Sequence, residues 1–176
     1  MQAVVVHTLK GREEMLNNIM DSLSGCKYPV VVYYEKNFEL GVFNRILKET
    51  CISEFSYFHD TCEIKDLSLL DFCFEDNPDK SVSFACYPRV YGMYLGKYLR
   101  RVLEKIEIPF VKDVHSEADF EITWTQQYAQ ADGNVIMIDN PLKDCESFVN
   151  KWGKKRMLLE NQYLRKYKHR WHRGML

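Results

Sequence analysis

The feature that most constrains this chain is the alternation of short, continuous apolar runs with stretches whose apolar residues recur at helical spacing. Strands are predicted at residues 3–7, 28–35, 54–59, 81–87 and 134–141. Helices are predicted at residues 12–23, 41–51, 65–76, 91–106, 117–133 and over most of 144–171. Uniformly apolar strands between helices are typical of an open, mostly parallel α/β sheet with helices on both faces. The last stretch adds a helical C-terminal appendage to that sheet.

The distribution of charge divides the chain into an acidic body and a basic tail. Between residues 151 and 173 there are nine lysines and arginines and one acid, Glu160, whereas the rest holds 15 basic and 24 acidic residues. The length of 176 residues suits one domain, and the 46% of hydrophobic residues argue against disorder. We therefore expect an α/β domain at 1–143 and a basic helical segment at 144–176 that packs on it.

A basic tail favours an anionic partner such as phosphate or nucleic acid. DNA or RNA contact through this tail, with its interleaved tyrosine and tryptophan residues, is one interpretation. A solvated helix face that docks on the acidic body is the other. The sequence leaves both open.

The six cysteines lie at least eleven residues apart, so the sequence contains no CxxC or Cys/His zinc spacing. The apolar start is too short for a signal peptide, and no run approaches the length of a membrane span. These features predict a cytoplasmic protein with reduced, mostly buried thiols.

Polar residues follow three of the predicted strands at their carboxyl ends. Thr8 and Arg12 follow the first, Glu35 ends the second, and Asp60 follows the third. Ligands of open α/β sheets bind at this edge, so these residues are candidates for contacts to a nucleoside and its phosphates. Arg45, on the next predicted helix, could bind two diphosphate oxygens with its fork. The loop after the first strand has no P-loop or GxGxxG motif, so an ordinary strand-to-helix turn is the alternative there. For Arg45 the alternative is an arginine on a helix surface.

Asp60 is also the first candidate for a metal ligand. A carboxylate at the end of a central strand can hold a divalent cation through oxygen, and that cation can neutralise phosphate charge. Alternation along the strand points His59 away from Asp60. A helix N-cap is the alternative role for Asp60.

The stretches "AVVVHTLKGREEMLNNIMDSL", "VVVYYEKNFELGVFNRIL" and "FHDTCEIKDLSLLDF" together resemble the nucleotide-diphospho-sugar glycosyltransferases with the fold called GT-A, a Rossmann-like arrangement. The resemblance covers the order of elements over about residues 3–140. It implies a donor such as a UDP- or GDP-linked sugar and a Mn or Mg ion at an Asp-X-Asp motif. Asp60 matches one acid of that motif, and its partner acid is missing.

The resemblance also implies an acceptor pocket that supplies a carboxylate base. Glu117 is the first candidate for this catalytic role and Asp119 the second. A capping box formed by Ser116 and Asp119 is the alternative for Asp119. Trp124 and Tyr128 could form a platform for a sugar ring or base, although such residues are more often core.

In the family that this chain resembles, basic residues or a histidine near the C-terminus often close over the diphosphate. Lys154 and Lys155 are the candidate diphosphate contacts, and His169 is a second candidate metal ligand. The resulting hypothesis is a small glycosyltransferase that moves a sugar to a hydroxyl acceptor. A nucleic-acid-binding accessory protein and a catalytically inactive interaction module are the alternatives.

Overall fold

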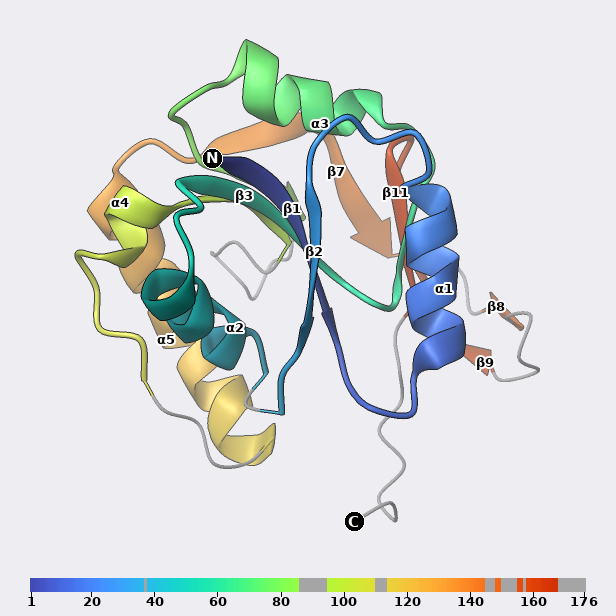
Figure 1. Cartoon of the computed structure of the whole chain (residues 1–176), viewed down its shortest axis with the longest axis horizontal. Coiled ribbons are helices and arrows are strands. Elements are labelled where there is room, and N and C mark those ends of the chain that lie inside the picture. The colour runs from blue at the N-terminus through green and yellow to red at the C-terminus, as the bar shows by residue number, and fades with distance from the viewer. Residues whose placement is uncertain are drawn as a thin grey trace.

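The computed structural model describes residues 1–36, 38–85, 95–109, 114–144, 148–149, 155–156 and 158–167 (Figure 1). In chain order the elements are β1 (Gln2–Thr8), α1 (Glu13–Ser22), β2 (Val30–Tyr34), α2 (Phe38–Glu49), β3 (Glu54–His59), β4 (Cys62–Ile64), α3 (Ser68–Asp71), the π-helical turn η1 (Phe72–Asp76), β5 (Val82–Ala85), β6 (Gly96–Leu99), α4 (Arg100–Leu103), α5 (Val114–Asp132), β7 (Ile136–Asp144), β8 (Phe148–Val149), β9 (Lys155–Arg156), β10 (Leu158–Glu160) and β11 (Leu164–Tyr167).

Within the described residues, one sheet runs in the order β2-β1-β3-β6-β5-β7-β10-β11-β4, and β8 pairs with β9 apart from it. β1 lies parallel to both β2 and β3, and β5 lies parallel to β7. β6 is antiparallel to β3 and to β5, so the other strands from β2 to β7 all point the same way. This part confirms the open, mostly parallel α/β sheet, which is consistent with a GT-A or Rossmann-like arrangement.

Helices cover both faces of this sheet, as the continuous apolar strands predicted. Successive residues of β1 alternate between the two faces: Val4 and Val6 pack in the core that includes α1, α3 and η1, whereas Val5 packs in the core under α2, α4 and α5. Figure 1 shows α1 on one side of the strands and α2 with α5 on the other. β3 lies between β1 and β6, so the strand that leads into Asp60 is internal to the sheet.

Beyond β7 the strands of the sheet alternate in direction. β10, β11 and β4 are all antiparallel to their neighbours, and β4 follows β3 after a turn at Asp60 and Thr61. Tyr167 donates its backbone N–H to the carbonyl of Thr61 at 2.8 Å. The C-terminal strand therefore lies beside the turn that carries Asp60.

Two predicted helices are wrong. Residues 96–99 form strand β6, and only 100–103 of the predicted helix 91–106 are helical, while 91–94 lie outside the described residues. The predicted helical appendage at 144–176 is wrong wherever it can be compared, because its described parts are strands. β10 and β11 join the same sheet as β1 to β7.

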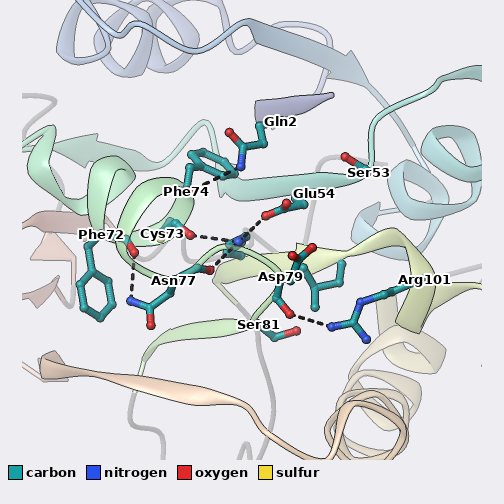
Figure 2. Close-up of polar contacts among 12 residues, drawn as sticks. Gln2, Ser53, Glu54, Phe72, Cys73, Phe74, Asn77, Asp79, Ser81 and Arg101 are labelled. Carbon is teal, nitrogen blue, oxygen red and sulfur yellow. Dashed lines mark hydrogen bonds and ion pairs between the residues drawn. The ribbon is translucent and has the colours of Figure 1, made fainter.

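A buried lysine explains why β6 belongs in the sheet. Lys97 is fully buried, forms an ion pair with Glu54 of β3, and donates to the carbonyls of Cys73 and Asn77 at 2.9 Å each. Figure 2 shows the polar contacts of Glu54, Cys73 and Asn77 meeting at one point. A buried ammonium needs such partners, because desolvation without them costs several kcal/mol, on the order of a whole domain's stability. Lys97 thus ties the end of η1 to the sheet.

Candidate functional site

The turn after β3 and the end of β1 bring three of the predicted site residues together. His7 and His59 are paired across the parallel strands, and Asp60 donates its N–H to the carbonyl of His7 at 2.8 Å. The Thr8 hydroxyl donates to Asp60 Oδ2 at 2.8 Å, and Arg12 Nη1 lies 3.3 Å from Asp60 Oδ1. The carboxylate is 1% exposed, so this is a buried, charge-assisted cluster.

Arg12 is more exposed than the carboxylate that it contacts. Its side chain is 19% exposed, against 1% for the carboxylate that it contacts. Arg12 stands directly before α1 at the N-cap position and makes no capping hydrogen bond with its side chain, because a guanidinium only donates; the side chain extends to Asp60. Gly11 precedes it with a φ of +84°, a left-handed conformation that favours glycine. The sequence "KGRE" therefore turns the chain tightly and leaves Arg12 at the carboxyl edge of the sheet.

Strand β11 adds a second cation, which the sequence analysis missed. Lys166 is paired with Cys62, two residues past Asp60, and is 6% exposed. Burial lowers the pKa of the His59 imidazole well below its usual value, and the nearby charges of Lys166, His7 and Arg12 lower it further. The strand register therefore places Lys166 beside the turn that carries Asp60. No local pattern marks this strand in the sequence, because "LRKY" does not alternate apolar and polar residues.

A separate polar group lies on the other face of the same strand ends. His7 Nδ1 lies 2.9 Å from the Tyr57 hydroxyl, and His7 Nε2 lies 2.9 Å from the carbonyl of Glu35. His59 Nε2 lies 3.9 Å from a carboxylate oxygen of Glu39 in α2. As predicted, alternation points His59 away from Asp60. His7 thus holds the chain at Glu35 against β1 and β3, which fixes the turn that carries this predicted nucleoside contact.

Arg45 is not brought to the Asp60 cluster. Its guanidinium donates to the carboxylate of Glu49, one turn further along α2, at 3.0–3.2 Å. It also lies over the Tyr33 ring, 5.0 Å from the centroid. Both arrangements are those of an arginine on a helix surface, which was the alternative given above.

The predicted acceptor side is described only in part. Glu117 and Asp119 lie in α5, as the helix prediction requires, but their side chains fall outside the described residues. Trp124 and Tyr128 are core residues: both are buried, and the Tyr128 hydroxyl accepts from the Leu99 N–H at 2.8 Å. They form no ligand platform. The main-chain course at Lys155 is a strand, while its side chain, Lys154 and His169 lie outside the described residues.

The described residues do not fit a divalent metal at Asp60. One carboxylate oxygen is engaged by Thr8 and the other by the Arg12 guanidinium, which repels a cation. Within the ranges given above, no group of three or more His, Cys, Asp and Glu side chains is placed to hold a metal ion. No chemical step is therefore assigned to a metal.

Comparisons with known proteins agree with the fold. No protein family matches the sequence, and no curated protein matches it. The crystal structure of A197 from STIV aligns with 91% of this chain and 94% of its own, with a TM-score of 0.52 and 10% sequence identity. A glycosyltransferase involved in the glycosylation of the major capsid of PBCV-1 aligns with 78% of this chain and 82% of its own, with a TM-score of 0.46 and 12% identity.

At these identities the comparisons bear on the fold alone. The alignment with A197 from STIV spans nearly the whole of both chains, so the two proteins share an overall α/β architecture. The TM-score of the second structure is too low to carry a conclusion. Across the helices that the structure describes, none has the length and apolar character needed to cross a membrane.

Proposed function

We propose that this chain is a glycosyltransferase that moves a sugar from a nucleoside-diphosphate donor to a hydroxyl acceptor. The observation that carries the proposal is the Arg12–Asp60 pair at the carboxyl ends of β1 and β3, with Lys166 beside it. Ligands of open α/β sheets bind at this edge, and clustered cations there favour a phosphorylated ligand. The order of elements resembles that of the GT-A glycosyltransferases, which selects a nucleotide sugar from the wider class of phosphorylated ligands.

The proposed reaction breaks the bond between the anomeric carbon of the sugar and the diphosphate oxygen. The bonding electrons leave with the diphosphate, and an acceptor hydroxyl oxygen forms the new bond to that carbon. Arg12 and Lys166 stabilise the charge of the departing diphosphate. Glu117 is the proposed base that takes the proton from the acceptor hydroxyl, with Asp119 as the second candidate.

The proposed contacts to the nucleoside come from the loops that follow β1 and β2. Glu35 is the proposed acceptor for a base or ribose, because hydrogen bonds to its main chain fix its position at the strand end. Thr8 has an indirect role, since its hydroxyl donates to Asp60 and the residue is 1% exposed. Lys154 and Lys155 remain proposed diphosphate contacts on the basis of the resemblance.

A melting-temperature screen tests the proposal. The panel contains nucleotides, UDP- and GDP-linked sugars, and DNA and RNA oligonucleotides, each with and without Mn²⁺ or Mg²⁺. We expect a rise in melting temperature with a uridine or guanosine diphosphate, because a ligand that binds only the folded state stabilises it. The nucleotide sugar that gives the largest shift is then incubated with candidate acceptors, and release of the free diphosphate is measured.

Two results would count against the proposal. The absence of a shift with every nucleotide would remove it. Stabilisation by oligonucleotides alone, weakening steeply with salt, would support nucleic-acid binding instead. The described part of the basic tail does not favour that second outcome, because Arg165 is paired with Glu160 at 2.8 Å.

A further inference from the structure

We infer that the site binds the donor diphosphate without a divalent metal, with Arg12 and Lys166 supplying the positive charge that a metal would bring. This inference rests on the proposed function, since it concerns the diphosphate of the same donor. It also gives a reason why the second acid of the Asp-X-Asp motif is missing: a site that uses cationic side chains needs no second carboxylate to hold a metal.

The geometry of Asp60 is the first observation. A metal ligand must direct at least one lone pair towards the cation, but the Asp60 carboxylate is buried, accepts from Thr8 at 2.8 Å, and faces at 3.3 Å the Arg12 guanidinium, which repels a cation. The Asp60 side chain is 1% exposed, whereas the Arg12 side chain is 19% exposed. Asp60 is therefore placed to orient Arg12, and Arg12 is the more exposed of the two.

The position of Lys166 is the second, independent observation. It arrives on β11, a strand from the far end of the chain, and its register places it opposite Cys62 and close to the Asp60 turn. Its charge, like that of Arg12, acts on His59 at the same strand end. Together the two side chains carry two formal positive charges, of which the Asp60 carboxylate offsets one. The planar fork of Arg12 also suits two phosphate oxygens, as a point charge does not.

Calorimetric titration with UDP and with GDP tests the inference on the whole chain. Each titration is made in EDTA and repeated with Mn²⁺ or Mg²⁺. We expect the nucleotide that binds to do so with the same Kd, within about twofold, in both conditions. Each of Arg12→Gln and Lys166→Met should weaken binding in EDTA by about tenfold, as expected for the loss of one charge-assisted contact.

Lys48→Gln is the matched control, because it removes one positive charge from the last turn of α2, where the chain returns to the amino end of β3. Its Kd should match that of the unmodified chain. Circular dichroism and a melting curve establish that each variant folds. If Arg12→Gln does not fold, Arg12→Lys keeps the charge and removes the fork, and the wild-type titrations in EDTA decide the question without any variant.

The outcomes separate this inference from the proposed function. Binding that appears only with Mn²⁺ or Mg²⁺ overturns the metal-free site and leaves the glycosyltransferase proposal standing. Binding in EDTA that neither Arg12→Gln nor Lys166→Met weakens overturns the assignment of these two cations. An absence of nucleotide binding in all conditions removes both proposals together.

Discussion

Thr8 Oγ1 donates a 2.8 Å hydrogen bond to Asp60 Oδ2, which joins the carboxyl ends of two adjacent parallel strands across 52 residues of sequence. The other oxygen of the same carboxylate faces Arg12. One buried acid therefore fixes both the strand ends and the cation that precedes α1. This arrangement makes the candidate site part of the structural core of the sheet.

Asp60→Asn should lower the free energy of unfolding by about 1–3 kcal/mol, because the amide leaves Arg12 without its carboxylate at a buried position. Urea unfolding measures this change. Asp21→Asn on the exposed side of α1 is the matched control, expected to change stability by less than about 0.5 kcal/mol. Equal stability of the two variants would contradict the structural role given to the Asp60 cluster.

Lys97→Met should lower the free energy of unfolding by more, about 3 kcal/mol or above, because it leaves the Glu54 carboxylate and two buried carbonyls without the ammonium. Adding Glu54→Gln to that variant should restore part of the loss, since the second change removes the uncompensated charge. A double-mutant cycle by urea unfolding measures the coupling between the two residues. Additive effects would show that the ion pair contributes nothing of its own.

Acidification should destabilise the fold through His59. Burial first, and then the charges of Lys166, His7 and Arg12, lower its pKa in the folded state below the ordinary value of 6.5. The unfolded chain therefore binds a proton that the folded chain excludes, and stability falls as the pH drops below about 6.5. The slope from this one group reaches at most about 1.4 kcal/mol per pH unit.

Urea unfolding between pH 5 and 8 measures the effect, and His59→Gln is the comparison. The variant has no imidazole to titrate at this position, so its stability should depend less on pH over that range. An identical slope in the two proteins would assign the pH dependence to other groups. Glu39, at 3.9 Å, is the acidic side chain that faces His59 from α2, so the same titrations are repeated on Glu39→Gln.

The first half of the fold could be predicted from local sequence because its signals are local. The run "AVVV", the apolar stripe of α1 and the strand before Asp60 each show their structure in a few consecutive residues. Thr8, Arg12 and Asp60 could also be grouped in advance, since parallel strands end at one edge. The contacts of Arg45 could not be predicted in this way, because the rotamer of its side chain decides whether the guanidinium reaches Glu49 or the strand ends.

The errors arose where contacts between distant residues decide the structure. Residues 91–106 have a helical apolar period, yet Lys97 is drawn into the sheet by Glu54, Cys73 and Asn77. The C-terminal strands likewise depend on distant partners, since Arg165 and Lys166 pair with β4, about a hundred residues earlier. A periodic pattern cannot show such pairings, and tertiary contacts override it.

Tyr128→Phe tests the corrected position of β6. The Tyr128 hydroxyl lies 2.8 Å from the Ser81 hydroxyl and accepts from the Leu99 N–H at 2.8 Å, in a fully buried environment. Removing it leaves two buried groups without this partner, so we expect a loss of about 1–3 kcal/mol. Hydrogen exchange at the Leu99 amide should accelerate, because this bond protects it.

Tyr34→Phe, at an exposed position on β2, is the control and should change neither the stability nor the exchange rate at Leu99. Unchanged exchange at Leu99 in Tyr128→Phe would mean that α5 does not hold the junction between β6 and α4.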